Sequence, residues 1–347
     1  MNDVSSSMDE IKNIGKKIVR PQTLLLGIFF LVGLSIGNFF PLLKDGTRDE
    51  SFRLLRPAAA SYKFIKPLVG VDITTDQNFP EFKNIKNIIT QFIERQFQEK
   101  KAALVSVYVR NADNAHWFGI NEEEKFQPGS LLKVPIMMAY LKASEARPEL
   151  KSKKIVYHGS DKRLPNELQT TLTEGQSYTV SELIITMIVK SDNEAKDLLL
   201  DYLDPDYLGE VYSDLGIPLP SSISDGISPR VYGRFFRRLY NATFLSRQSS
   251  EEAMQLLTET DFTKGIVAGV PLSIDVAHKY GERGIYKTDE RADMVEFHDC
   301  GFVYISTSPY FLCIMTRGYS TDDLGAIIQQ ISFLVYQNMT STHEHLP

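Results

Sequence analysis

The pattern of apolar and polar positions predicts a helix near each end of a folded domain, with strands just inside those helices. Apolar residues recur at helical spacing over 82–98 and 323–337. Strand-like segments occupy 103–110, 115–119, 272–282, 297–306 and 310–316. Between them, residues 144–240 are mostly helical in pattern. This order predicts an α/β (α+β) fold: an antiparallel sheet flanked by N- and C-terminal helices, with an inserted all-helical lobe and a site in the cleft between lobe and sheet.

The first 58 residues follow a different pattern. Residues 22–43 contain no charged side chain, and a helix of that length spans about 30 Å, enough to cross a bilayer. A polar tail precedes this run and no small-residue cleavage site follows it, which argues against a cleaved signal peptide. We therefore expect a cytoplasmic tail over 1–21, a transmembrane anchor over 22–43, a linker over 44–58 and one domain over 59–347. Basic residues flank the anchor about equally, so they do not fix its orientation.

Composition narrows the possible functions. The chain is 43% hydrophobic and 24% charged, as is usual for a globular protein. Its net charge of −6 and the lack of a basic stripe argue against nucleic-acid binding. The six histidines and two cysteines show no metal-ligand spacing, and no glycine-rich phosphate loop is present. We expect neither a metal nor a cofactor.

The segment that organises the chemistry is 126–140. Ser130 follows Pro128 and Gly129 and is well placed to cap a buried helix. Lys133 comes three residues later, so a helix would place its ammonium on the same face as the hydroxyl. This spacing is typical of a serine activated by a lysine, but an ordinary helix cap has the same spacing.

Two later motifs favour the catalytic interpretation. Ser191-Asp192-Asn193 follows the apolar helical run 180–189, and Lys279-Tyr280-Gly281 ends a strand-like run. The order S-x-x-K, S-D-N, K-[S/T]-G is the signature of class A β-lactamases and penicillin-binding proteins. From about residue 59 to the C-terminal helix, the chain resembles this family, with Tyr280 in place of the usual Ser or Thr.

The resemblance implies roles for the first two motifs. Ser130 would be the nucleophile and Lys133 its base, which requires the pKa of the lysine to fall from about 10.4 toward 7–8. Ser191 would relay a proton to the leaving nitrogen. Asn193 would orient Lys133 and bind a substrate amide, while Asp192 would brace the backbone of its own motif.

The resemblance also assigns substrate-binding roles around the third motif. Lys279 would lie across the cleft and attract a substrate carboxylate, beside Tyr280 and Gly281. The backbone N–H groups of Ser130 and Glu282 would form the oxyanion hole. Tyr280 carries its hydroxyl several ångströms further out than a threonine, which weakens the expected hydrogen bond to that carboxylate.

A second departure concerns deacylation. Class A enzymes carry a glutamate that activates the deacylating water, on a loop with the pattern E-x-x-L-N. That pattern is absent from 204–230, where the loop looks shortened. Glu210, Asp214 and Asp225 are possible substitutes, although simple surface solvation is the default for each.

Three other residues allow two interpretations each. His298 begins a strand beside 279–282, so it either approaches the cleft or is a structurally bonded histidine. A hairpin over 297–316 would set Cys300 roughly opposite Cys313. A disulfide is then one outcome, and two buried free thiols are the more common one.

Together these features predict a membrane-anchored serine hydrolase whose domain lies outside the cytoplasmic membrane, as the family resemblance implies. Its substrates would be β-lactams or, alternatively, the D-alanyl-D-alanine end of cell-wall peptides. An alternative of another class is a non-catalytic cell-wall-binding module. Tyr280 and the missing loop glutamate favour this alternative. The five intact motif side chains oppose it: Ser130, Lys133, Ser191, Asn193 and Lys279.

Overall fold

The computed structural model describes residues 54–55, 62–67, 70–71, 79–159, 170–220, 225–288 and 291–341. The chain divides into two units, Met1–Glu50 and Ser51–Pro347, and every described residue belongs to the second. The predicted tail, anchor and most of the linker therefore lie outside the described residues. Within the described part, no helix is both long and apolar enough to span a membrane.

A five-stranded antiparallel sheet forms the centre of the domain, in the order β4-β3-β9-β8-β7. The strands are β3 (Ala102–Asn111), β4 (Trp117–Ile120), β7 (Val276–Thr288), β8 (Arg291–Val303) and β9 (Tyr310–Gly318). Because β7 is the edge strand, it pairs with β8 along one side, and its other side faces the helical lobe. The fold thus confirms the predicted antiparallel sheet and places the Lys279 motif on its edge strand.

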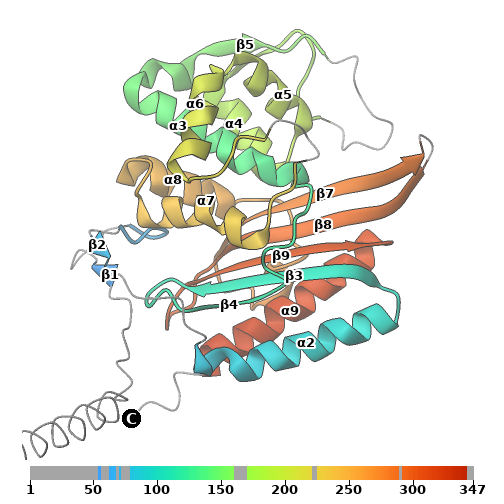
Figure 1. The fold of residues 1–347 in the computed structure, drawn as a ribbon. Helices are drawn as coiled ribbons and strands as arrows, with labels where there is room; N and C mark the ends of the chain where they lie inside the picture. The colour runs from blue at the N-terminus through green and yellow to red at the C-terminus, as the bar shows by residue number, and fades with distance from the viewer. Residues whose placement is uncertain are drawn as a thin grey trace, which may run out of the picture. The chain divides into compact units, whose positions relative to one another are not determined.

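The two terminal helices cover one face of the sheet (Figure 1). They are α2 (Lys83–Gln98), preceded by the 3₁₀ turn η1 (Pro80–Phe82), and α9 (Thr321–Ser341). Apolar side chains from both helices pack with those of β3 and β9 in one core cluster, which includes Ile89, Val107 and Ile328. The amphipathic patterns predicted both helices because each buries one apolar face.

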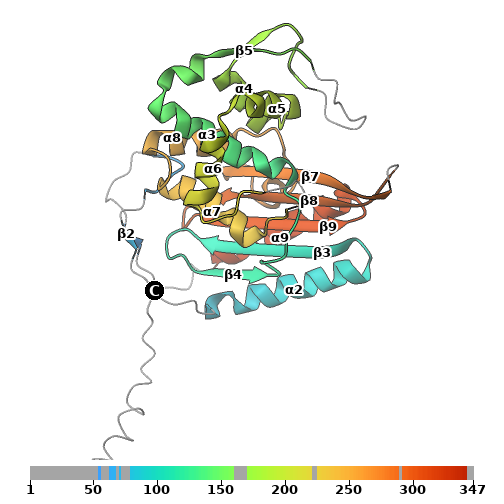
Figure 2. The ribbon, with the colours of Figure 1, turned by 45° about the horizontal axis from the view of Figure 1, so that its top comes forward.

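The opposite face carries the helical lobe (Figures 1 and 2). Its elements are η2 (Gly129–Leu132), α3 (Lys133–Ala146), η3 (Pro148–Ser152), β5 (Lys154–Val156), β6 (Ser177–Thr179), α4 (Val180–Val189), α5 (Asn193–Tyr202), α6 (Pro205–Asp214), α7 (Pro229–Asn241) and α8 (Arg247–Thr258). The 3₁₀ turn η4 (Val267–Gly269) instead packs against α9, in the core cluster of the other face. A second core cluster joins this lobe to the sheet through residues such as Phe236 and Phe311, whose rings lie 5.3 Å apart. β5 pairs with β6 outside the main sheet, and β1 (Leu54–Leu55) pairs with β2 (Gly70–Val71).

The predicted strand 272–282 is displaced along the chain. β7 begins at Val276, because a turn closed by the Ile274 N–H and the Pro271 carbonyl precedes it, and Leu272 is fully exposed. At its other end β7 continues six residues beyond Glu282 and pairs with β8. Hydrophobic alternation gave the wrong start because an exposed leucine in a turn resembles a strand residue.

The predicted hairpin of β8 and β9 is confirmed. Cys300 is paired directly with Cys313, and the two sulfur atoms form a disulfide. The expectation of free thiols was therefore wrong, although the register that brings the cysteines together was predicted correctly.

Candidate active site

Ser130 lies in the 3₁₀ turn η2, one residue after Gly129, whose φ of +53° favours glycine. The prediction that Ser130 caps the following helix was wrong, because α3 begins at Lys133 and its N-cap residue Leu132 makes no side-chain cap. The hydroxyl oxygen of Ser130 instead accepts a hydrogen bond from Lys133 Nζ at 3.0 Å. The serine hydroxyl is therefore available for chemistry rather than tied to a helix end.

Lys133 is fully buried and its ammonium donates to several oxygens at once. Besides Ser130, it contacts the carbonyl oxygen of Ser191 at 2.5 Å, the hydroxyl of Ser191 at 3.2 Å and Asn193 Oδ1 at 2.8 Å. These contacts place the first two motifs around one nitrogen atom. Fixing the lysine by four oxygens holds it in a single position beside the serine.

The loop that carries Ser191 joins α4 to α5 and is conformationally strained. Ser191 has a φ of +55°, which a non-glycine residue adopts rarely and which is common at functional sites. Asp192 stabilises this loop: it caps α5 by accepting from the Ala195 N–H and also accepts from the hydroxyl of Thr170 and the N–H of Thr171. Asp192 thus makes the bracing contacts expected of it.

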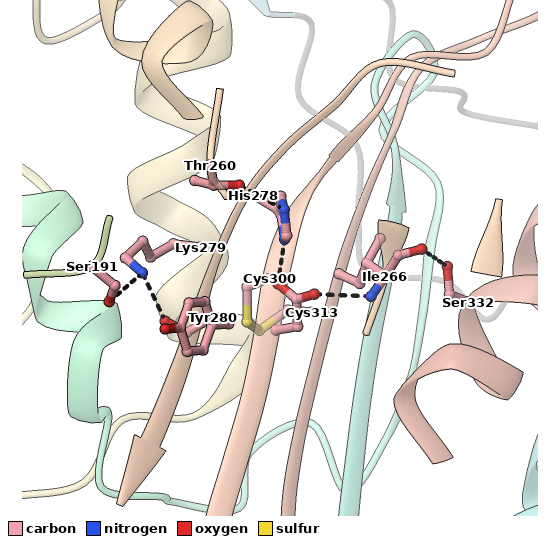
Figure 3. A network of polar contacts seen from close by, with 10 residues as sticks. Ser191, Thr260, Ile266, His278, Lys279, Tyr280, Cys300, Cys313 and Ser332 are labelled. Carbon is pink, nitrogen blue, oxygen red and sulfur yellow. Dashed lines mark hydrogen bonds and ion pairs between the residues drawn. A yellow bond between two sulfur atoms is a disulfide. The ribbon is translucent and has the colours of Figure 1, made fainter. Parts of the chain in front are cut away.

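Lys279 approaches the same serine from the sheet. Its Nζ donates to Ser191 Oγ at 2.8 Å and to the Tyr280 carbonyl at 3.3 Å (Figure 3). Because Lys133 Nζ also contacts Ser191 Oγ, this hydroxyl lies between the two lysines. The side chain of Lys279 has no exposed surface. Burial, and then the charge of Lys133, hold the pKa of Lys279 well below its usual value, while the charge of Asp299 acts in the opposite direction.

Tyr280 covers Lys279 instead of extending away from the site. The Tyr280 ring is stacked on the Phe262 ring, with centroids 4.0 Å apart. Lys279 Nζ lies 4.2 Å from the centroid of the Tyr280 ring. Burial raises the pKa of the Tyr280 phenol, and the Ser191 hydroxyl opposes that shift. The substitution of tyrosine for the family residue therefore changes access to Lys279 as well as the position of a hydroxyl.

The backbone of β7 packs tightly against the nucleophile turn. A β-carbon at Gly281 would lie 2.5 Å from the Pro128 carbonyl oxygen, so only glycine fits there. A β-carbon at Gly129 would lie 2.7 Å from the carbonyl oxygen of Glu282 and 3.2 Å from its nitrogen. The main chain of Glu282 therefore lies beside the turn that carries Ser130, while its side chain is exposed.

The three acidic substitutes for the loop glutamate lie in different surroundings. Glu210 and Asp214 are exposed on α6, and Asp214 pairs with Arg238. Asp225 lines a cavity of about 750 Å³ that also reaches Pro128 and Leu132, on either side of Ser130 in sequence. Among these three, only Asp225 is placed on a cavity next to the nucleophile turn.

His298 does not approach the cleft. It is fully buried, donates from Nε2 to the Gln127 carbonyl at 3.0 Å, and accepts from the Thr316 N–H at Nδ1. Burial lowers its pKa to about 4. The alternative interpretation, a structurally bonded histidine, is the one that fits.

Two contributors to the site have no motif that could have revealed them. Phe262, which stacks on Tyr280, comes from the loop after α8. Tyr232, on α7, donates a hydrogen bond from its hydroxyl to the Leu131 carbonyl at 3.0 Å. This contact helps to hold the nucleophile turn in place. Both act through contacts between segments far apart in sequence.

The sequence model of the β-lactamase enzyme family matches residues 83–339, and the chain belongs to this family. No curated protein sequence matches the chain. Among solved structures, a PBP-A variant in an acyl-enzyme complex with penicillin G is 21% identical, with a TM-score of 0.64 over 76% of this chain and 100% of that one.

Two β-lactamases have the same fold. The TLA-3 extended-spectrum β-lactamase is 19% identical, with a TM-score of 0.64 over 73% of this chain and 98% of that one. A β-lactamase from Burkholderia phymatum is 22% identical, with a TM-score of 0.62 over 74% of this chain and 99% of that one. At these identities the likeness establishes the shared architecture.

Proposed function

We propose that this protein is a serine hydrolase that forms a covalent acyl-enzyme through Ser130. The observation that carries the proposal is the contact of Lys133 Nζ with Ser130 Oγ at 3.0 Å, inside a cage completed by Ser191 and Asn193. A nucleophile paired with a base that other groups hold in place is the arrangement that acyl transfer requires.

In the acylation step, the Ser130 oxygen attacks a carbonyl carbon while its proton moves to the neutral amine of Lys133. Two buried ammonium groups that share the Ser191 hydroxyl repel each other, which favours the loss of one proton from the pair. Because Lys133 is the lysine in contact with Ser130, we assign it the role of base. Main-chain N–H groups of Ser130 and Glu282 would hold the developing oxyanion.

Collapse of the tetrahedral intermediate breaks the carbon–nitrogen bond, and the leaving nitrogen takes up a proton. The hydroxyl of Ser191 is the donor we assign, because it contacts both Lys133 and Lys279 and its own proton can be replaced from either. Asn193 would bind a substrate amide next to this serine.

The substrates we propose are β-lactams, with slow release of the acyl group. No residue of 204–230 matches the E-x-x-L-N pattern, and of Glu210, Asp214 and Asp225 it is Asp225 that lines the cavity reaching the nucleophile turn. The acyl adduct should therefore accumulate. Slow release also fits the second candidate, a D-alanyl-D-alanine carboxypeptidase that β-lactams inactivate.

We also propose that residues 22–43 anchor the protein in the cytoplasmic membrane, with the hydrolase domain outside the cytoplasm. The uncharged span supports the anchor. The Cys300–Cys313 disulfide supports the orientation, because such bonds persist in oxidising compartments. Full-length protein should remain with membranes after a carbonate wash, and protease added to intact cells should cut beyond residue 60. Complete protection of that region would contradict the orientation.

A non-catalytic binding module of the same fold is the rival from another class. Fluorescent penicillin separates the two. Full-length protein should become labelled in a denaturing gel, and Ser130→Ala should not. Parallel assays with a D-alanyl-D-alanine peptide then distinguish a carboxypeptidase from a β-lactamase. Neither labelling nor turnover of either compound would favour the binding module.

A further inference from the structure

Two fully buried side chains of β8 hold the segment that leads into the nucleophile turn. Glu296 Oε2 accepts a hydrogen bond from the Gln127 N–H at 2.8 Å, and His298 Nε2 donates one to the Gln127 carbonyl at 3.0 Å. Both main-chain polar groups of Gln127, three residues before Ser130, are therefore bonded to side chains of the sheet. We call Glu296 and His298 together the Gln127 clamp.

Glu296 belongs to an ion pair that leaves one of its oxygens for the main chain. Arg317, which lies opposite Glu296 in β9, donates to Oε1 from Nε at 2.9 Å and from Nη2 at 2.6 Å. The Gln127 N–H takes the other oxygen, Oε2. A buried carboxylate is costly unless it is paired and hydrogen-bonded, and here both conditions are met. Arg317 therefore fixes the orientation in which Glu296 meets the main chain.

The partners of His298 define its tautomer. Nε2 faces a carbonyl, which only accepts, and Nδ1 faces the Thr316 N–H at 3.3 Å, which only donates. These partners place the proton on Nε2 of a neutral ring. The Phe126 ring also lies edge to face against the imidazole, with centroids 5.3 Å apart. A rotation of the imidazole would break these contacts, so His298 presents a fixed donor to Gln127.

The turn also rests on β7 next to the Gln127 clamp. His298 lies opposite Gly281 in the strand register, and Glu296 is two residues away in β8, so all three positions share one face of the sheet. A β-carbon at Gly281 would lie 2.5 Å from the Pro128 carbonyl oxygen. The main chain therefore touches β7 at the residue that directly follows Gln127.

We propose that Glu296 and His298 are positioning residues for the acylation step. By holding both polar groups of the Gln127 main chain, they fix the turn that follows. Ser130 then meets Lys133 and the substrate carbonyl in the productive position. The two side chains act through the main chain and take no part in the chemistry. A misplacement of about 1 Å can cost about 10²-fold in rate, so a fixed turn matters to the reaction. This inference rests on the proposed acylation of Ser130.

Two substitutions at His298 separate positioning from simple structural support. Glutamine places its amide nitrogen near the position of Nε2 and keeps the donor to Gln127, whereas asparagine reaches only the position of Nδ1. Quenched labelling of full-length protein over a range of penicillin G concentrations gives the maximal acylation rate and the half-saturating concentration. His298→Asn should lower the maximal rate by about 10–100-fold and leave the half-saturating concentration unchanged, whereas His298→Gln should stay within about threefold of wild type.

A second pair of variants covers the case in which His298→Asn does not fold. Glu296→Gln keeps an oxygen for the Gln127 N–H, whereas Glu296→Met has a similar length but no such acceptor. In both variants Arg317 can turn to solvent, because its side chain is already 32% exposed. The maximal acylation rate should stay near the wild-type value in Glu296→Gln and fall by about tenfold in Glu296→Met.

His116→Asn is the matched control. This histidine contacts Glu81 and directly precedes β4, at the opposite edge of the sheet from β7. Its substitution should change neither kinetic constant. Equal losses in His298→Asn and His298→Gln would show a merely structural role and overturn the proposal. A loss in neither variant, or a change confined to the half-saturating concentration, would overturn it as well.

Hydrogen exchange of the main-chain amides gives a readout that needs no substrate. In His298→Asn and in Glu296→Met, the amides of 126–133 should exchange about tenfold faster than in wild type, while those of α9 keep their rates. Unchanged exchange over 126–133 in both variants would overturn the Gln127 clamp. A wild-type protein that forms no adduct would instead refute the proposed function, and the exchange result would then decide whether Glu296 and His298 hold the turn.

Discussion

The ammonium nitrogen of Lys133 lies 3.0 Å from the hydroxyl oxygen of Ser130, and both groups are held at the junction of η2 and α3. Lys133 follows Ser130 by three positions in sequence, but the contact depends on the 3₁₀ turn, in which Ser130 does not cap the helix. The same nitrogen touches Ser191 and Asn193, so one buried side chain links the first two motifs.

Replacing Lys133 with alanine should therefore reduce the rate of acylation by about 10²–10⁴, because an unassisted hydroxyl is a poor nucleophile at neutral pH. The rate is measured by stopped-flow or quenched labelling with penicillin. Lys142→Ala removes a partly exposed lysine from the same helix and serves as the matched control. Wild-type acylation by Lys133→Ala would show that another group takes the proton.

Tyr280→Thr restores the residue usual in the family. Removing the ring that lies on Phe262 and over Lys279 should open direct access to the ammonium. Acylation by a carboxylate-bearing penicillin should become faster by about tenfold, the worth of one hydrogen bond to a charged group, with no change in release.

Tyr280→Phe separates the effects of the ring and the hydroxyl in the same assay. Because the phenylalanine ring still covers Lys279, this variant should acylate no faster than wild type. Slower acylation by Tyr280→Thr would indicate that the phenol itself binds the substrate.

The sequence allowed the antiparallel sheet, its two covering helices and the inserted lobe to be predicted, because each depends on a local periodicity. The motifs likewise predicted that Ser130, Lys133 and Lys279 share a function. Their arrangement around Ser191 was not predictable in detail, because the left-handed backbone of that residue is imposed by tertiary contacts.

Other features of the site depend on partners more distant in sequence. The stacking of Tyr280 on Phe262 joins residues from β7 and the loop after α8, and no motif connects them. The burial of His298 was similarly ambiguous, because a strand pattern does not say which element covers each face. Contacts of this kind are set by packing between elements rather than by the order of residues.

Removing the Cys300–Cys313 disulfide should destabilise the folded protein. A double substitution, Cys300→Ser with Cys313→Ser, should lower the free energy of unfolding by about 3 kcal/mol, the value for a loop of roughly this length. Denaturant unfolding of the wild type with and without reductant is the comparison. Thiol counting on denatured, non-reduced protein should find no reactive thiol, and two reactive thiols would refute the bond.

We expect the folded protein to lose stability in mild acid because His298 is buried. Its pKa is lowered to about 4 in the folded protein, whereas an unfolded histidine titrates near 6.5. As the pH falls below about 6.5, the unfolded chain takes up a proton that the folded protein does not. The free energy of unfolding should therefore decrease by about 3 kcal/mol between about pH 6.5 and pH 4.

His298→Gln provides the comparison for that prediction. Glutamine can retain a donor toward the Gln127 carbonyl but does not titrate. Denaturant unfolding across this pH range should show a flatter dependence in the variant than in wild type. Identical slopes would mean that other groups cause the loss.

The most direct test of the proposed function is the intact mass of full-length protein over time after mixing with penicillin G. The proposed mechanism predicts a mass increase equal to one penicillin, mapped by peptide analysis to Ser130 and absent in Ser130→Ala. The adduct should persist well beyond the mixing time, because no loop glutamate activates water. An unchanged mass at every time point, with no hydrolysed penicillin in solution, would contradict the central claim that Ser130 is an acylated nucleophile.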